Sequence, residues 1–337
     1  MPVESGAARL SAVMAGFGGK RILAIGDLML DEFIWGKVSR ISPEAPVPIV
    51  NVTGESYYPG GAANVARNLR EFTAGSAVMG ISGTDAQGRR LMELLAGAGI
   101  DTAGVQQEAS HSTTVKTRII ARNQQVVRVD RERKAALTDA QAEMAMRYLD
   151  GVIDTLDGIV VADYGKGVLT QSLADYVCRE AQAHGKVLTV DPHPHTSLNW
   201  QGATAIKPNR AEAFLAAGMP ASDPVVPVLG DEPLLEAGRR LLRRWKTGSL
   251  LITLGEHGML LLEGDAPPYH TPTRAQDVFD VSGAGDTAIA VFTLGLASGA
   301  TPAEAAELAN LASGIVVGKL GTATVTLAEL QASVGPA

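Results

Sequence analysis

From residue 158 onward, short apolar runs alternate regularly with segments that have the composition of helices. Apolar runs of about 4–8 residues that end at Gly, Asp or Pro are typical of buried strands. Strands alternating with helices favour a parallel, doubly wound sheet with helices on both of its faces. The expected strands are 158–163, 187–191, 250–254 and 259–262, and the expected helices are 171–184, 209–217, 232–245, 285–298 and 302–319. This alternation predicts an α/β fold.

The first part of the chain begins the same pattern and then departs from it. A strand is expected at 21–27, a helix at 61–72, a strand at 77–81 and a helix at 87–98. Two extended segments, 33–55 and 112–131, do not fit the alternation. The first contains Pro43, Pro46 and Pro48, which exclude a central strand there, and the second resembles a hairpin that turns at Asn123. We assign both segments to a small β lid beside the main sheet, within one domain that spans residues 1–337.

Bulk composition restricts the classes of partner. The 337 residues are 46% hydrophobic, enough for one large core, and their formal net charge is −7. Because an acidic chain without a basic stripe gains little from counterion release, nucleic acid is not an expected partner. Cys178 is the single cysteine and is expected to be a small buried residue of a helix. No signal pattern or membrane-length apolar run is present, so we expect a cytoplasmic protein without a membrane partner.

The most informative motif is Asp280-Val-Ser-Gly-Ala-Gly-Asp286-Thr287, which runs directly into an expected helix. Gly283 and Gly285 permit a tight turn and a close approach of the backbone to a ligand. Amides at a helix N-terminus attract anions, so this turn could hold a phosphate during its transfer. Asp286, in the first helical turn, would then accept the proton of an attacking hydroxyl. The alternative is an ordinary glycine turn whose acidic residue favours the helix dipole.

A second glycine pair lies in the segment Pro59-Gly60-Gly61-Ala-Ala-Asn64. The glycines would let a sugar approach the main chain, and Asn64 offers a donor and an acceptor to adjacent hydroxyls. Asp27, at the end of the first strand, could accept from a hydroxyl pair, and Asp31 could join it. Ligands of doubly wound sheets bind at the carboxyl ends of the strands, where these residues fall. The alternatives are a helix-start residue for Asn64 and a strand-end cap for Asp27.

Polar residues also follow the later strands and would share this ligand edge: Asp163, Lys166, Asp191, Lys207, Asn209, Thr253 and Gly255. Asn209 and Glu212 are three residues apart and could order water around Mg²⁺ on a nucleotide, or could form a capping box. The glycines of Thr253-Leu-Gly255-Glu-His-Gly258 suit a phosphate or ribose contact, or a hairpin turn. Asn310 and Gly314 give the last expected helix a small polar face on which adenine could stack, although tight helix packing is the alternative.

The glycine pair with Asn64, the Asn209–Glu212 pair and the turn before Asp286 occur in the same order as in ribokinase-like (PfkB-type) carbohydrate kinases. This resemblance covers about residues 21–330. It implies a doubly wound sheet, a β lid over the sugar, and Mg-ATP as the phosphoryl donor. The roles that it implies are Asp286 as catalytic base, Gly283, Ala284 and Gly285 as the anion hole, Asn310 near the adenine, and Asp280 near a monovalent cation such as K⁺.

Within this family, the segments Ser39–Pro48, Ala162–Gly167 and Val317–Thr322 look like those of heptose 7-phosphate kinases. Such enzymes phosphorylate C1 of D-glycero-D-manno-heptose 7-phosphate in the synthesis of ADP-heptose for lipopolysaccharide. The resemblance implies that the 7-phosphate is bound by cations and that Asp163 belongs to the sugar site. The cations that suit this role are Arg40, Arg118 and Lys166.

One position departs from these kinases, which follow Asp-Pro with Lys-Gly, because here Asp191-Pro192 precedes His193-Pro194. The missing cation leaves open another sugar, sugar phosphate or nucleoside as the acceptor. A non-catalytic regulator that binds nucleotide or sugar is a third hypothesis, against which an intact Asp286 argues. Many relatives continue into a second domain that transfers a nucleotidyl group. Because this chain stops at Ala337, we expect that second activity to reside outside it. We also expect a homodimer, since a second copy would cover the exposed edges of the lid.

Overall fold

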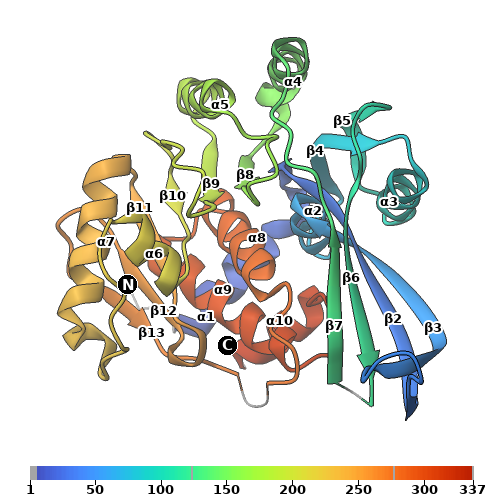
Figure 1. Ribbon diagram of the computed structural model, residues 1–337. Coiled ribbons are helices and arrows are strands. Elements are labelled where there is room, and N and C mark those ends of the chain that lie inside the picture. The colour runs from blue at the N-terminus through green and yellow to red at the C-terminus, as the bar shows by residue number, and fades with distance from the viewer. Residues whose placement is uncertain (1–5, 123, 276–277, 336–337) are drawn as a thin grey trace.

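The computed structural model describes residues 6–122, 124–275 and 278–335, and within them a nine-stranded sheet lies between two layers of helices (Figure 1). The strand order is β13-β12-β11-β10-β9-β8-β1-β4-β5. Neighbouring strands from β11 to β5 pair in parallel, and only the β11–β12 and β12–β13 pairs of these described strands are antiparallel. The bounds are β1 (Arg21–Gly26), β4 (Gly75–Gly83), β5 (Asp101–Glu108), β8 (Gly158–Ala162), β9 (Val187–Asp191), β10 (Ala205–Ile206), β11 (Ser249–Thr253), β12 (Met259–Leu262) and β13 (Tyr269–Thr271). The predicted mainly parallel α/β fold is confirmed.

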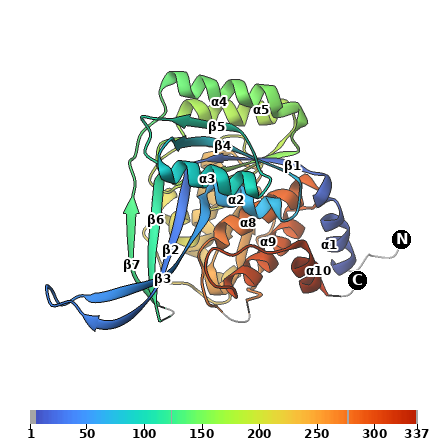
Figure 2. The ribbon, with the colours of Figure 1, turned by 90° about the vertical axis from the view of Figure 1, so that its right-hand side faces the viewer.

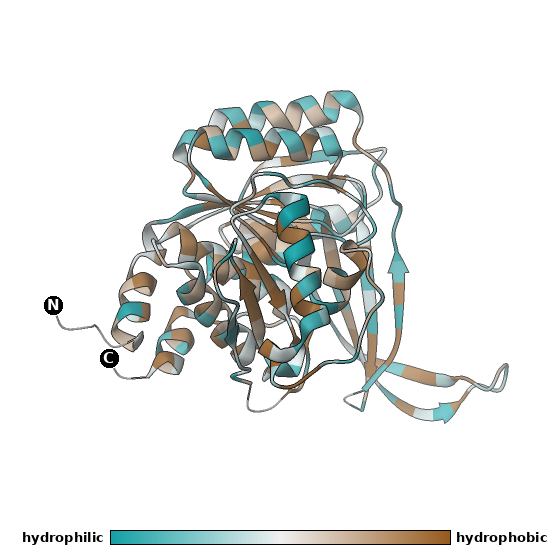
Figure 3. Ribbon diagram, turned by 90° about the vertical axis from the view of Figure 1, so that its left-hand side faces the viewer, coloured by the Kyte–Doolittle hydropathy of each residue, from teal (hydrophilic) through white to brown (hydrophobic). Residues whose placement is uncertain are grey.

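Both faces of this sheet are apolar and covered. In β1, Leu23 and Ile25 pack against helices α4 to α7, whereas Ile22 and Ala24 pack against α1 to α3 and α8 to α10. Successive side chains of a strand point to opposite faces, so a strand that is apolar throughout requires helices on both sides. The helices are α1 (Gly6–Ala15), α2 (Ala62–Arg70), α3 (Ala86–Gly97), α4 (Asp139–Val152), α5 (Gln171–Ala183), α6 (Arg210–Ala216), α7 (Glu232–Trp245), α8 (Ala284–Ala297), α9 (Pro302–Val317) and α10 (Leu327–Val334). Figure 3 shows the hydrophobic strands at the centre and mixed helices around them.

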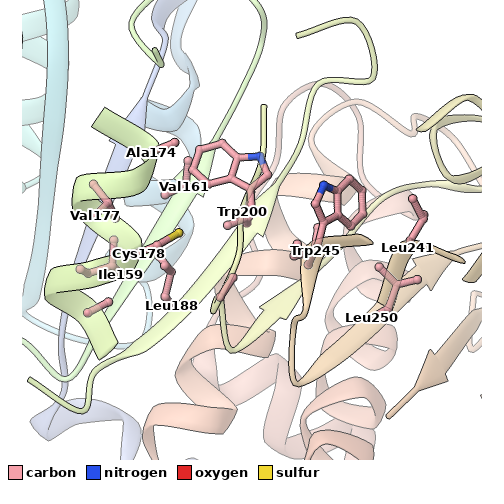
Figure 4. Packing of buried hydrophobic residues seen from close by; sticks show 14 of the residues in the cluster. Ile159, Val161, Ala174, Val177, Cys178, Leu188, Trp200, Leu241, Trp245 and Leu250 are labelled. Carbon is pink, nitrogen blue, oxygen red and sulfur yellow. The ribbon is translucent and has the colours of Figure 1, made fainter. Parts of the chain in front are cut away.

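Cys178 confirms its predicted place in this core. It lies on α5 and belongs to the apolar cluster that includes Ile159 and Leu188 of the sheet (Figure 4). Burial raises the pKa of its thiol to about 12, so the group stays protonated at neutral pH. Among the described residues, no helix has the length and apolar character that crossing a membrane would need.

The β lid is a separate four-stranded sheet with the order β3-β2-β6-β7, and it projects from one end of the main sheet (Figures 1 and 2). Its strands are β2 (Leu28–Ile41), β3 (Pro48–Gly61), β6 (Thr114–Ala121) and β7 (Gln124–Arg131). The strands β2 and β3 are longer than the segment 33–55 predicted for them, because β2 begins two residues after β1 ends. Asn123, where the hairpin is predicted to turn, lies outside the described residues.

Several elements are absent from the sequence prediction, namely α1, β5, α4, β10, β13 and α10. The edge strand β5 is only partly buried and so lacks a continuous apolar run. The start of α4 does have a local signal, because Thr138 and Gln141 form a capping box. Tertiary packing, rather than local pattern, accounts for the two-residue strand β10, which is completed only by its neighbours β9 and β11.

The topology brings several loop residues to one edge of the sheet. Gly26 of β1 pairs in register with Ala162 of β8, and Ala162 pairs with Asp191 of β9. Since these strands are parallel, the residues that follow them lie together at the carboxyl edge. Asp27 and Asp163 are therefore neighbours, as predicted, although they are far apart in the sequence.

Candidate active site

The chain enters α8 through a glycine in the left-handed conformation. Gly283 is the residue before the helix and has φ of +81°, which side chains with a Cβ rarely allow. A Cβ at this position would lie 3.1 Å from Asn64 Nδ2 and 3.2 Å from Thr322 Cγ2. Of the predicted anion-hole amides, that of Ala284 already donates to the Val281 carbonyl at 3.2 Å. The turn has the predicted shape, and the amides that remain for an anion belong to its glycines and to the first turn of α8.

Asp286 lies in that first turn and is only 7% exposed. Its two carboxylate oxygens accept hydrogen bonds from different elements. Tyr164, in the loop after β8, donates its hydroxyl to Oδ1 at 2.5 Å, and Asn64 of α2 donates Nδ2 to Oδ2 at 2.7 Å. Three segments that are distant in the sequence therefore meet at one carboxylate.

Burial is the largest influence on this carboxylate and raises the pKa of Asp286 to about 6. The hydrogen bonds from Asn64 and Tyr164 oppose that shift, the charge of Asp191 adds to it, and Lys207 opposes it. A carboxylate with this pKa is mostly ionised at neutral pH and is more basic than an exposed aspartate. Burial and the neighbouring carboxylate raise the pKa of Tyr164 well above its ordinary value, which keeps its hydroxyl a donor.

Asn64 has one polar atom left over. Its Nδ2 is used by Asp286, but its buried Oδ1 has no hydrogen-bond partner among the described residues. The helix α2 is fixed against α8 by a short chain of bonds, in which Asn68 donates to the Asn64 carbonyl at 2.9 Å and Thr287 donates to Asn68 Oδ1 at 2.8 Å. An unpaired buried acceptor is costly unless a donor such as a sugar hydroxyl approaches it.

A cavity of about 470 Å³ opens on the other side of the glycine turn. Its wall is mostly apolar and includes Val281, Ala288 and Val317. Seven of the predicted site residues line it: Thr253, Gly255, Gly258, Ala284, Gly285, Asn310 and Gly314. A largely apolar cleft with a few polar groups is the usual form of a small-molecule site.

The inner surface of the lid contributes charged residues. Asp31 is 6% exposed and pairs with Arg118 of β6 at 2.5 Å. Lys166, in the loop after β8, pairs with Glu132 at 2.5 Å. Lys166 thus belongs to the loop that carries Tyr164, and Arg118 is held by Asp31 in the part of β2 nearest the main sheet.

Residues 20–329 match the pfkB family carbohydrate kinases. The chain belongs to this family. It is 43% identical over 316 residues to the bifunctional protein HldE of Desulfatibacillum aliphaticivorans and 42% identical over 326 residues to the HldE of Geobacter sulfurreducens. These alignments cover 94% and 97% of this chain but 63% and 65% of the two relatives, so the chain spans less than two thirds of their length.

Solved structures of ribokinase-like proteins share the fold. Ribokinase of Arabidopsis thaliana, complexed with ribose and ATP, superposes with a TM-score of 0.72 at 16% identity and covers 94% of this chain and 99% of its own. Phosphofructokinase-2 of Escherichia coli, in complex with potassium, has a TM-score of 0.72 at 20% identity and covers 94% of this chain and 97% of its own. Membership of the carbohydrate kinase family and the ribokinase-like fold with a β lid, both predicted from the sequence, are confirmed.

The side chain of Asp27 bonds to the main chain of a neighbouring loop, and its predicted contact with a sugar stays a prediction. Its carboxylate accepts hydrogen bonds from three backbone N–H groups of the loop after β8, those of Tyr164 at 2.9 Å, Lys166 at 3.0 Å and Val168 at 3.1 Å. Its side chain therefore shapes the loop that presents Tyr164. Asp163 is used in a similar way, because it accepts from the Gly165 amide at 2.8 Å and the Thr196 hydroxyl at 2.6 Å.

Close packing requires the glycine pair before α2, and its predicted contact with a sugar stays a prediction. A Cβ at Gly60 would lie 2.5 Å from Asp31 Oδ2, and one at Gly61 would lie 2.4 Å from the Asp27 carbonyl oxygen. Gly61 has φ of +61°, a backbone conformation that favours glycine. Both glycines thus allow β3 to lie against β2 at the point where Asp31 enters the site.

Arg40 is not brought to the site within one chain. It lies in the exposed outer half of β2, nine residues beyond Asp31 in the same strand. At ~3.3 Å per residue this separation is about 30 Å, too far for a shared ligand. Within one chain Arg40 therefore lies far from Asp31, and its role as a cation for the acceptor phosphate stays a prediction.

The Asn209–Glu212 pair forms the capping box that was the alternative to a magnesium site. Asn209 Oδ1 accepts the Glu212 amide at 2.9 Å, and Glu212 Oε2 accepts the Asn209 amide at 2.7 Å. Lys207 is buried and pairs with Asp191 at 2.9 Å. A Cβ on Gly285 would lie 3.6 Å from Lys207 Nζ, so this cation stands directly beside the glycine turn.

Two further predictions concern cations and nucleotide. The Asp280 carboxylate accepts the Ser282 amide at 2.9 Å and the Gly321 amide at 3.2 Å, and a monovalent cation beside it stays a prediction. In the described part of the chain, no group of three or more His, Cys, Asp and Glu side chains is placed to hold a metal ion. Asn310 lines the cavity, but its Nδ2 donates to Thr271 Oγ1 at 2.9 Å and to the Pro272 carbonyl at 2.6 Å.

Sequence reasoning missed Tyr164, although a usable signal existed. Tyr164 follows Asp163 directly after β8, on the edge where ligand-facing residues were sought. His193, the departure from the heptose kinase pattern, lies against the same loop, since a Cβ on Gly165 would be 3.0 Å from its Nδ1. The unexpected histidine therefore lies beside the loop that carries Tyr164.

Proposed function

We propose that this chain is an ATP-dependent kinase that phosphorylates the C1 hydroxyl of D-glycero-D-manno-heptose 7-phosphate, the kinase step of ADP-heptose synthesis. The observation that carries the proposal is the position of Asp286. Its carboxylate lies in the first turn of α8, directly after the glycine turn that lines an apolar cavity, and its partner Tyr164 lies against Lys116 of the lid. The alignment with HldE proteins over 94% of the chain, together with the heptose kinase segments, supports the acceptor.

In the proposed reaction, the C1 hydroxyl oxygen attacks the terminal phosphorus of ATP while Asp286 takes the proton of that hydroxyl, and ADP leaves in line. Tyr164 and Asn64 hold the carboxylate in one orientation. The free Oδ1 of Asn64 can accept from another hydroxyl of the sugar. The amides of the glycine turn and Lys207 offset negative charge on the transferred group.

The nucleotide is proposed to occupy the cavity beside the glycine turn. Apolar residues such as Ala288 and Val317 suit an adenine face, and Gly255 offers open space for a ribose or phosphate. Mg²⁺ usually keeps several waters and binds through one or two carboxylates plus substrate phosphates. The half-buried carboxylate of Glu212 fits that requirement, even though it also serves the capping box. When bound, Mg²⁺ would neutralise charge on the phosphates of ATP.

A screen of acceptors by coupled ADP release tests this function. The panel includes heptose 7-phosphate, unphosphorylated heptose, ribose, fructose, fructose 6-phosphate and adenosine. The expected result is turnover with heptose 7-phosphate that Asp286→Asn abolishes while ATP binding persists. Turnover of ribose, fructose or adenosine, with none of heptose 7-phosphate, would reject the acceptor. Near-normal turnover by the Asp286→Asn variant would reject the assigned base.

The lid is proposed to pair with the lid of a second copy. Its strands expose several aliphatic side chains, of which Ile41 is 61% exposed, Val52 56%, Val127 45% and Val129 43%. Exposed apolar strands promote association unless another surface covers them. A symmetric dimer that covers the edge strand β7 and the outer halves of β2 and β3 would bury these side chains.

A further inference from the structure

One face of the lid carries more positive charge than its own carboxylates can pair. In β2 and β6, Asp31 pairs in register with Lys116, and in β6 and β7, Lys116 pairs with Asp130 and Arg118 with Arg128. Cross-strand partners share a face of the sheet, and so do alternate residues of one strand. Three cations and two carboxylates therefore lie on this surface, which we call the inner lid face.

The two arginines use both carboxylates. Arg118 pairs with Asp31 and stacks on Phe33, with the guanidinium carbon 5.2 Å from the ring centroid. Arg128 makes a two-point contact with Asp130, at 2.8 Å and 3.0 Å. Among the described residues, no carboxylate lies within ion-pair distance of Lys116. Lys116 thus has no carboxylate partner among the described residues of the inner lid face and the loops around it.

Lys116 is half-buried, and its ammonium group lies beside the loop that carries Tyr164. Its Nζ lies 5.5 Å from the centroid of the Tyr164 ring, and the hydroxyl of that ring donates to Asp286. The cation therefore lies over the ring of the residue whose hydroxyl donates to the proposed base.

The electrostatic surroundings favour an anion at this point. Partial burial lowers the pKa of Lys116, and the positive charges of Lys166 and Arg128 lower it further, against the opposing influence of Asp31 and Asp130. A partly buried ammonium without a counterion is costly, and a dianionic phosphate would remove that cost.

We propose that Lys116 binds the phosphate that the acceptor already carries, at the end of the sugar remote from the hydroxyl that reacts. The inference rests on the proposed function, because it assumes that the acceptor hydroxyl lies at Asp286. It narrows the acceptor to phosphate monoesters of sugars, since a neutral sugar would leave Lys116 unpaired.

The test compares Lys116→Met and Lys116→Arg with the wild type, using heptose 7-phosphate and unphosphorylated heptose as acceptors. We expect Lys116→Met to raise the KM for heptose 7-phosphate by about 10- to 100-fold, the factor expected when one charge-assisted hydrogen bond is lost. The KM for ATP should stay the same, as should the weak reaction with unphosphorylated heptose. Lys116→Arg should restore most of the affinity. Calorimetric titration with heptose 7-phosphate should show the same loss without turnover.

Lys37→Met is the matched control, because Lys37 is an exposed lysine of the same lid, farther along β2. If Lys116→Met and Lys37→Met bind heptose 7-phosphate equally well, the subsite is wrong and the proposed function stands. If the wild type instead phosphorylates a different sugar phosphate, and Lys116→Met weakens that one, the subsite stands and the named acceptor is wrong. A wild type that prefers an unphosphorylated sugar would overturn both.

Discussion

Replacing Tyr164 by phenylalanine should move the pH profile of the reaction, because it removes one of the two hydrogen bonds to Asp286. A hydrogen bond to a charged group contributes about 1.5–3 kcal/mol, and 1.36 kcal/mol corresponds to one pKa unit. The Tyr164 bond lowers the pKa of Asp286, which is about 6 in the intact site. Its loss should therefore raise that pKa by about 1–2 units.

The sign of the effect follows from the role of Asp286 as a base. Only the ionised carboxylate accepts a proton, so the acid limb of kcat/KM should shift to higher pH by the same amount. At pH 7 the ionised fraction should fall from about nine tenths to between about one half and one tenth, and near pH 9 the variant should approach the wild type. The measurement is kcat/KM by coupled ADP release from pH 5.5 to about 9.

Tyr176→Phe provides a matched control. Tyr176 also donates its hydroxyl to a carboxylate, that of Asp150, but the pair is exposed and lies on α5 and α4, away from the site. Its pH profile should equal that of the wild type. An unshifted profile for Tyr164→Phe would refute the assignment of Asp286 as the titrating base, and an equal loss of rate at every pH would refute the action of Tyr164 through that pKa.

Two further predictions concern stability and assembly. Because burial raises the pKa of Asp286 from 3.8 to about 6, the folded state binds the proton more tightly than the unfolded state, and stability is lost as pH rises between these values, by about 3 kcal/mol. In the Asp286→Asn variant, the new side-chain amide can donate to the free Oδ1 of Asn64. The variant should therefore melt at or above the wild-type temperature at pH 7.5 and lose that advantage near pH 4. A lower melting temperature of the variant at pH 7.5, measured by calorimetry, would contradict this. Replacing Val127 and Val129 by aspartate should convert a micromolar dimer into a monomer in sedimentation equilibrium, and a wild type that sediments as a monomer would exclude the dimer.

The sequence alone determined the elements whose signals are local. Apolar runs that alternate with helical segments predict the sheet, because strand and helix periodicity are properties of neighbouring residues. The turn from Gly283 to Asp286 is recognisable for the same reason, since its glycines and its acidic residue are needed within one helical turn. Asn209 and Glu212 show the limit of prediction from local patterns, because the same spacing fits both a capping box and a metal contact. In the structure these two residues form a capping box at the start of α6.

Only the tertiary structure decided which side chains meet. Tyr164 and Asp286 are 122 residues apart, and Asn64 and Asp286 are 222 residues apart, so their contacts depend on β1 and β8 being neighbours and on α2 lying against α8. The same packing turned Asp27 inward to the backbone of a loop and left Lys116 without a carboxylate among the described residues. Charge pairing is a property of neighbours in space, and no local pattern encodes which residue of a cluster is left over.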